Sequence, residues 1–191
     1  MTVSDNPCGD SVNKDMKTNI ALIGFMGTGK STVGRAVAKK LQRKFIELDK
    51  IVVQRAGKSI PDIFQQDGEI TFRELEIQAT KDIAREKRMV IACGGGIVLN
   101  NINIDRLRKD AVIIYLTATP GVIMKRISHD KNVRPLLNVA DPALRIKELL
   151  KFRRPFYERA ADIKINTSKL DIDAVAKQII DRLKKDESFD I

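Results

Sequence analysis

The hydrophobic positions along the chain follow two spacings, and each spacing predicts one kind of element. Short runs rich in apolar residues are typical of strands buried on both faces of a sheet. Five such runs occur, at 20–23, 45–49, 89–93, 111–116 and 161–166. Between them, apolar residues recur every three or four positions, as on one face of a helix. The clearest segments of this kind are 31–42, 69–87, 120–127, 142–159 and 172–183. Strands that alternate with helices predict an α/β fold with a mainly parallel sheet covered on both faces.

Polar residues and prolines mark where several helices begin. Ser59, followed by Pro61 and Asp62, predicts the start of a short helix that Gly68 then breaks. Thr119-Pro120 and Asp141-Pro142 predict two further starts. In the helix after Asp141, four apolar residues are expected to face inward, namely Leu144, Ile146, Leu149 and Phe152.

The length of 191 residues suits one domain. Residues 1–18 are polar and predict a disordered leader, so the domain is expected to cover 19–185, with a tail at 186–191. Within it, the polar and basic stretch at about 128–139 predicts a mobile lid over a site. His129, the only histidine, lies in this stretch and is expected at the surface.

The first apolar run ends in a glycine-rich loop that carries a strong chemical signal. Gly24, Gly29, Lys30 and Ser31 match the phosphate-binding pattern G-x-x-x-x-G-K-[ST]. Glycines allow backbone N–H groups to approach phosphates closely, and the following helix adds its positive end. The same loop contains Gly27, Thr28 and Thr32. A chance Gly-rich turn is the alternative, but the strand before the loop and the helix after it favour a nucleotide site, with Lys30 on phosphates and Ser31 on Mg²⁺.

Acidic residues and a second glycine run follow two other strands. Glu47 and Asp49 end the second run, two residues apart and therefore on the same side of an extended chain. They are placed either for chemistry or for capping the next helix. Gly94, Gly95 and Gly96 follow the third run, where bare backbone would let a ligand lie close. No acid follows Cys93, so a metal-binding carboxylate is expected from Glu47 or Asp49.

Charge and composition narrow the class of protein. The formal net charge of +10 fits either nucleic acid or small polyanionic ligands, and the scattered basic residues favour the latter. No apolar run approaches 18 residues and two cysteines give no disulfide framework, so we expect a cytoplasmic protein without a membrane span. Arg73, flanked by Glu74 and Glu76, reads on composition alone as a solvated helix charge.

Together these blocks resemble the shikimate kinases, P-loop kinases of the nucleoside-monophosphate-kinase type. The resemblance covers about 19–184 and rests on six blocks in the expected order, namely 24–35, 45–49, 59–76, 93–96, 133–137 and 153–157. It implies a three-layer α/β/α fold with strand order 2-3-1-4-5. It also implies phosphorylation of the 3-hydroxyl of shikimate by ATP, in the pathway to chorismate and the aromatic amino acids, by a monomer. Glu47-Leu48-Asp49 departs from the Asp-x-Asp that the family commonly carries.

The resemblance also implies residue roles. Asp49 would orient or deprotonate the attacking hydroxyl, and Arg73 and Arg153 would hold the substrate carboxylate with their guanidinium groups. The backbone of Gly94 to Gly96 would line the substrate pocket. Nucleotide contacts would come from Gly27, Thr28, Gly29, Lys30, Ser31, Thr32, Arg126 and Arg134. Ser31 and Glu47 would serve one Mg²⁺, Arg126 would stack on adenine, and Arg134 would reach the phosphates from the lid.

Two other functions remain open at this level. A gluconate-type kinase of the same fold would share the phosphate-binding loop. A P-loop nucleotide sensor or RNA-binding regulator would use the positive charge instead, and would show salt-sensitive RNA binding.

Overall fold

Five parallel strands form the centre of the molecule. A computed structural model describes residues 16–129 and 135–191. The strands are β1 (Asn19–Ile23), β2 (Lys44–Glu47), β3 (Met89–Ala92), β4 (Ala111–Thr117) and β5 (Ile163–Asn166). Their order is β2-β3-β1-β4-β5, and every neighbouring pair is parallel, as predicted. β1 lies in the middle of the sheet, so its carboxyl end opens at the centre of the sheet edge.

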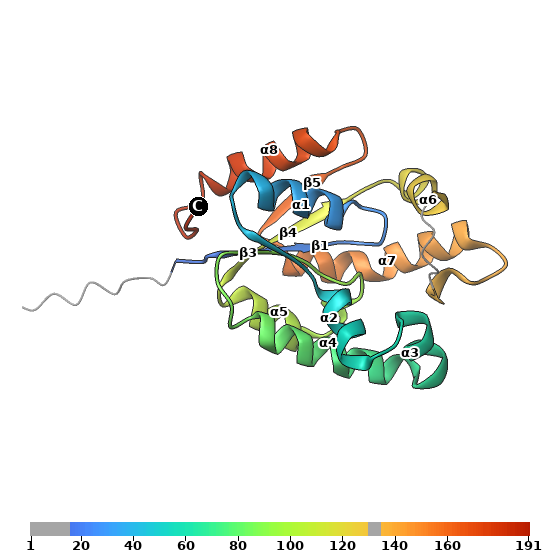
Figure 1. Ribbon diagram of the computed structural model, residues 1–191. Helices are drawn as coiled ribbons and strands as arrows, with labels where there is room; N and C mark the ends of the chain where they lie inside the picture. Colours follow the sequence, from blue (N-terminus) through green and yellow to red (C-terminus); the bar gives the residue numbers. More distant parts are fainter. Residues whose placement is uncertain (1–15, 130–134) are drawn as a thin grey trace, which may run out of the picture.

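Helices cover both faces of this sheet (Figure 1). They are α1 (Lys30–Lys40), α2 (Leu48–Ala56), α3 (Ile60–Gln66), α4 (Gly68–Ile83), α5 (Asn101–Arg108), α6 (Pro120–Ser128), α7 (Pro142–Ala160) and α8 (Ile172–Leu183), with 3₁₀ turns η1 (Ile97–Leu99) and η2 (Pro135–Leu137). Ser59 and Thr119 cap α3 and α6 as predicted, by accepting the amides of Asp62 and Val122.

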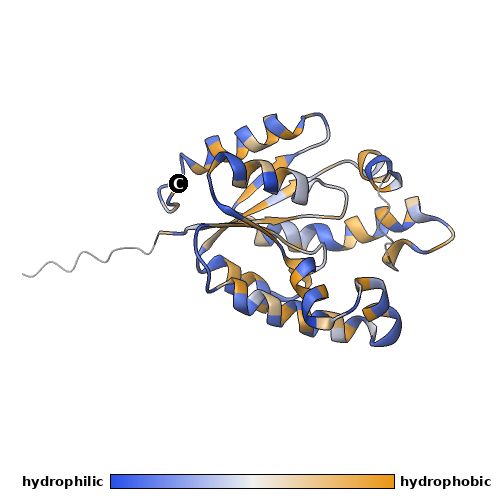
Figure 2. Ribbon diagram, in the orientation of Figure 1, coloured by the Kyte–Doolittle hydropathy of each residue, from blue (hydrophilic) through white to orange (hydrophobic). Residues whose placement is uncertain are grey.

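Alternate residues of the three inner strands, β1, β3 and β4, pack into two separate cores. Ile20 and Leu22 of β1 pack with α1 and α8, whereas Ala21 and Ile23 pack with helices on the opposite face. This explains why β3 and most of β1 and β4 are continuously apolar, whereas the edge strand β5 alternates apolar and polar residues. Figure 2 shows the hydrophobic colouring along the strands and the mixed colouring of the surrounding helices. None of the helices in the described residues is long and apolar enough to cross a bilayer.

The inward face of α7 differs from the prediction. Ile146 and Leu149 are buried, but Leu144 and Phe152 are 53% and 59% exposed. The buried stripe of the helix continues instead through Arg153 and Tyr157 to Ala160. Hydrophobicity alone could not predict this stripe, because two of its members are polar.

The two ends of the described chain lie together. Lys17 forms a parallel bridge with Phe189, and the Lys17 amide donates to the Ser188 carbonyl at 2.8 Å. Phe189 is 4% exposed and belongs to the core beside α1 and α8. Lys17, Thr18 and Phe189 therefore pack on the domain.

Candidate active site

The glycine-rich loop joins β1 to α1, as predicted. Gly24, Gly27 and Gly29 have φ angles of 143°, 74° and 94°, which side chains rarely tolerate. A Cβ at Gly24 would also lie 2.3 Å from the Leu116 carbonyl oxygen of β4. The Lys30 amine donates to the carbonyls of Gly24 and Phe25 at 2.9 and 3.0 Å. The loop therefore wraps around the lysine at the carboxyl end of the central strand.

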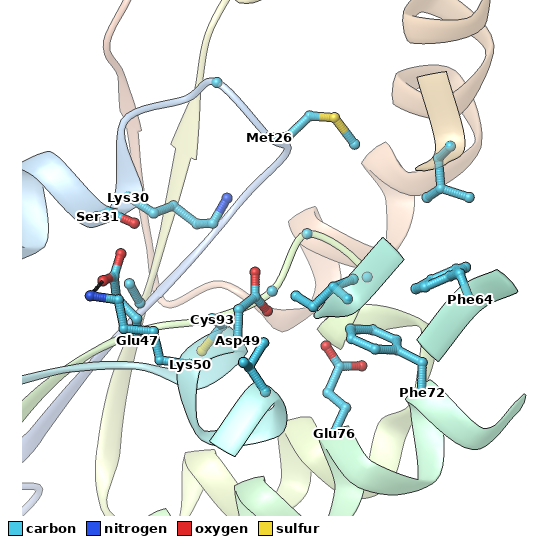
Figure 3. A pocket seen from close by; sticks show the side chains of 18 of the residues that line it. Met26, Lys30, Ser31, Glu47, Asp49, Lys50, Phe64, Phe72, Glu76 and Cys93 are labelled. Carbon is cyan, nitrogen blue, oxygen red and sulfur yellow. Dashed lines mark ion pairs between the residues drawn. The ribbon is translucent and has the colours of Figure 1, made fainter. Parts of the chain in front are cut away.

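A cavity of about 730 Å³ runs from this loop to α4 and α7. Ten of the predicted site residues line it beside Glu47 and Asp49, namely Gly27, Gly29, Lys30, Ser31, Thr32, Arg73, Gly94, Gly95, Gly96 and Arg153. Figure 3 shows Lys30, Asp49 and Glu76, from three different helices, around one space. Thr28 is buried instead, with its hydroxyl donating to the Phe25 carbonyl at 2.7 Å.

The three consecutive glycines lie against the charged groups of the cavity. A Cβ at Gly94 would fall 2.8 Å from Asp49 Oδ1 and 2.7 Å from Glu76 Oε1. A Cβ at Gly95 would lie 3.9 Å from Arg153 Nη1, and one at Gly96 only 2.3 Å from Arg73 Nη1. Side chains at Gly94 or Gly96 would push the charged groups away, whereas a Cβ at Gly95 would make ordinary van der Waals contact. The glycine run thus lets a carboxylate and two guanidiniums converge on one stretch of backbone.

Asp49 reaches the cavity from a helix and not from a strand. β2 ends at Glu47, and α2 begins at Leu48, so Asp49 lies in the first helical turn. The prediction that Glu47 and Asp49 share one side of an extended chain is therefore wrong. The capping alternative fails as well for Glu47, which occupies the N-cap position without a side-chain cap bond.

Glu47 lies beside Ser31, and the two could hold a metal ion. Arg35 and Lys50 form ion pairs with Glu47 at 2.7 and 2.9 Å. Burial raises the pKa of Glu47, but hydrogen bonds from Ser31 and Lys50 and the charge of Arg35 outweigh it, so the pKa ends below its usual value. Within the described ranges there is no cluster of three or more His, Cys, Asp or Glu side chains suited to a metal. One carboxylate and one hydroxyl are nevertheless the hard oxygen ligands that Mg²⁺ uses, with water and phosphates filling the remaining positions.

Arg73 is held by two carboxylates of its own helix. It pairs with Glu69 at 2.8 Å and with Glu76 at 3.0 Å, and its side chain is only 18% exposed. Composition alone suggested a solvated charge, and the structure places this guanidinium in the cavity wall.

Glu76 is a cavity residue that the sequence reasoning missed. It is 1% exposed, and burial raises its pKa to about 7 in spite of the neighbouring Arg73. Its Oε1 atom has no hydrogen-bond partner in the described part of the chain. The available signal was its spacing, because Glu76 follows Phe72 by four residues and precedes Ala79 and Ile83 on the buried stripe of α4.

Arg153 enters the cavity from the buried stripe of α7. It is 3% exposed, and its Nη1 donates to the Gly95 carbonyl at 3.3 Å. The Tyr157 hydroxyl donates to the same carbonyl, while the Tyr157 ring stacks on Tyr115 with centroids 4.8 Å apart. Arg153 is therefore anchored to the glycine run rather than to an acidic partner.

Thr28 and Arg126 do not line this cavity. Arg126 sits on α6, where its guanidinium donates to the Gly27 carbonyl at 3.2 Å and to the Thr167 carbonyl at 2.8 Å. His129 follows α6 and is exposed, as expected. Arg134 and residues 130–133 of the predicted lid lie outside the described residues. The cavity thus combines a phosphate-binding end with an end of paired carboxylates and guanidiniums, which suits a nucleotide facing a small hydroxylated acid.

Comparison with known proteins agrees with this arrangement. The family model described as Shikimate kinase matches residues 26–184. The shikimate kinase of Caldanaerobacter subterraneus subsp. tengcongensis is 52% identical over 162 residues, covering 85% of this chain and 94% of that protein. The shikimate kinase of Thermodesulfovibrio yellowstonii is 49% identical over 162 residues, covering 85% and 92%. The structure of shikimate kinase from Acinetobacter baumannii in complex with shikimate superposes with a TM-score of 0.85 at 34% identity, covering 91% and 96%.

Proposed function

This chain belongs to the shikimate kinase family, and we propose that its cavity is where ATP phosphorylates the 3-hydroxyl of shikimate. The products are shikimate 3-phosphate and ADP, in the pathway to chorismate and the aromatic amino acids. One observation carries the assignment of the site. Asp49, Arg73 and Arg153 converge on Gly94 to Gly96 inside a cavity that Lys30 also lines.

Asp49 is the group that we assign to the attacking hydroxyl. It projects from the first turn of α2 into the space between Lys30 and Glu76 (Figure 3). A carboxylate there accepts the hydroxyl proton and aligns the oxygen with the γ-phosphate, so that the reaction gains from both proton removal and orientation. Phosphoryl transfer depends chiefly on such positioning and on charge stabilisation.

Arg73 and Arg153 form the proposed carboxylate site. Guanidinium groups bind planar carboxylates through parallel hydrogen bonds, and burial strengthens these bonds. Arg153 Nε is buried without a hydrogen-bond partner among the described residues. Arg73 is compensated by Glu69 and Glu76, so the substrate carboxylate competes with internal acids for this arginine.

Lys30, Ser31 and Glu47 are the residues that we assign to the phosphates and to Mg²⁺. Lys30 reaches the β- and γ-phosphates, and Gly27, Gly29 and Thr32 line the same end of the cavity. The hydrogen-bonded pair of Ser31 and Glu47 supplies two oxygen ligands for the ion. When bound, Mg²⁺ neutralises charge on the phosphate oxygens during transfer.

Arg126 and Thr28 complete the proposed nucleotide site, with Arg134 assigned to the transferring phosphate by family resemblance alone. The guanidinium of Arg126 is fixed by Gly27 and Thr167, and a guanidinium of fixed plane suits stacking on adenine. The family resemblance implies a monomer. Cys93 is a buried free thiol, in keeping with a reducing cytoplasm.

A coupled ADP-release assay with ATP, Mg²⁺ and shikimate tests the proposal. ADP release should require shikimate, and Arg73→Ala should raise the KM for shikimate at least about tenfold. Lys81→Ala is a matched control, because it removes one positive charge from the exposed side of the same helix. ADP release that does not depend on shikimate would refute the function. An Arg73→Ala variant that behaves like Lys81→Ala would refute the carboxylate site.

A further inference from the structure

We propose that Thr167, at the end of β5, is a positioning residue for the phosphate-binding loop. Its hydroxyl holds the Thr28 carbonyl so that the Gly29 N–H faces the phosphates of the bound nucleotide. This inference rests on the proposed nucleotide site and adds to it a residue that touches neither substrate.

The Thr167 hydroxyl is completely surrounded by polar partners. Thr167 is 2% exposed, and its Oγ1 lies 3.0 Å from the Thr28 carbonyl and 3.1 Å from the Thr117 carbonyl. The same oxygen accepts a hydrogen bond from Arg126 Nη1 at 2.9 Å. A hydroxyl has one hydrogen to donate. The Thr117 carbonyl already receives the Thr167 amide at 2.8 Å, so the hydroxyl hydrogen is best used by Thr28.

Because the peptide bond is planar, the hydrogen bond to the Thr28 carbonyl also fixes the direction of the Gly29 N–H. The peptide between Thr28 and Gly29 is trans, so its C=O and its N–H point in opposite directions. Because Thr167 holds the Thr28 carbonyl on the side of β5, the Gly29 N–H must point the other way. Gly29 lines the cavity, whereas Thr28 is 1% exposed. The N–H is therefore directed toward the space beside Lys30 where phosphates bind.

Arg126 supports the same loop through both terminal nitrogens of its guanidinium group. One terminal nitrogen bridges the Gly27 carbonyl and the Thr167 hydroxyl, and the other donates to the Thr167 carbonyl at 2.8 Å. A Cβ at Gly27 would lie 3.2 Å from Ile127 Cγ1, so the loop also rests directly on α6. Two successive carbonyls of the loop, those of Gly27 and Thr28, are thus held from outside by Arg126 and Thr167. Pre-set N–H groups bind anions without reorganising, which is the benefit expected from such support.

Three variants separate the hydroxyl from the rest of the side chain. Thr167→Val keeps the branched shape and removes the hydroxyl, whereas Thr167→Ser keeps the hydroxyl and removes the methyl. Thr117→Val is the matched control, because the Thr117 hydroxyl contacts only the Ile165 carbonyl, at 3.4 Å, among the described hydrogen bonds. Each full-length protein is checked for folding by circular dichroism. Its affinities for ADP and for adenosine are then measured by calorimetry, and its KM values for ATP and shikimate by steady-state kinetics.

Thr167→Val should weaken ADP binding and raise the KM for ATP by about tenfold, on the scale of one lost hydrogen bond to a charged ligand. The KM for shikimate should stay within about twofold, since it does not involve the Gly29 N–H. Adenosine affinity should fall clearly less than ADP affinity, because Arg126 loses the hydroxyl acceptor but keeps its bonds to the Gly27 and Thr167 carbonyls. Thr167→Ser and Thr117→Val should resemble the wild type. If Thr167→Val does not fold, Thr167→Ala, which places no methyl against the Thr28 carbonyl, carries the same expectation.

Several outcomes would overturn the proposal. Unchanged ADP affinity in a folded Thr167→Val protein is one, and equal losses for ADP and adenosine are another. Equal defects in Thr167→Ser and Thr167→Val would assign the effect to the methyl group and to packing. Because ADP binding is measured without shikimate, these outcomes are independent of whether the wild type phosphorylates shikimate, so failure here differs from failure of the proposed function.

Discussion

Replacing Glu76 by glutamine should change how stability depends on pH. Glu76 is 1% exposed, and its pKa of about 7 in the folded protein exceeds the usual glutamate value of 4.5 because burial disfavours the charged carboxylate. Arg73 acts against the shift at 3.0 Å, and the nearby charges of Asp49 and Arg153 act in opposite directions. Between these two pKa values the folded protein binds more protons at Glu76 than the unfolded chain does.

Proton linkage gives the sign and the size of the effect of Glu76 on the free energy of unfolding. Since the folded state binds the extra proton, this group's contribution is fully present below about pH 4.5 and is lost as the pH rises to about 7. For these two pKa values, the free energy of unfolding should fall by about 2 to 3 kcal/mol between pH 5 and pH 8. A glutamine cannot ionise, so Glu76→Gln lacks this loss. The free energy of unfolding of the variant, relative to that of the wild type, should therefore rise by the same amount between pH 5 and pH 8.

Urea unfolding of both proteins at four pH values between 5 and 8 measures this difference directly. Other titrating groups cancel in the comparison of wild type and variant. Glu74→Gln is the control, because it neutralises an exposed carboxylate of the same helix. A difference between wild type and Glu76→Gln that stays constant within about 0.5 kcal/mol across the range would refute the reasoning. It would mean that Arg73 keeps Glu76 ionised throughout.

Three further substitutions test the assigned roles. Asp49→Asn should lower kcat at least about a hundredfold with ADP affinity nearly intact, and near-normal turnover would contradict the assignment. Gly96→Ala should raise the KM for shikimate about tenfold but not that for ATP, since its Cβ would lie 2.3 Å from Arg73 Nη1. An unaltered KM would show that Arg73 can move without loss. Glu47→Gln should raise the Mg²⁺ concentration giving half-maximal rate several-fold in magnesium titrations, and an unchanged titration would exclude Glu47 as a ligand.

The sequence by itself determined the elements of the sheet and the phosphate-binding loop. Both depend on local patterns, namely apolar runs that fit strands buried on two faces and glycines whose φ angles only a tight turn requires. The strand order 2-3-1-4-5 came from family resemblance, because neighbours in a sheet are distant in sequence, and the structure confirms it.

Only the tertiary structure decided which polar side chains are buried and with what partners. Glu76, Arg153 and Thr167 look like ordinary helix or loop residues in sequence, yet each is at most 3% exposed. For Arg153 and Thr167, such burial is tolerated because groups from other elements, namely the Gly95 and Thr28 carbonyls, accept hydrogen bonds. Asp49 was predicted at the end of a strand, but it lies in the first turn of α2, from where it lines the cavity. These pairings join residues far apart in the chain, so periodicity and local propensity carry no record of them.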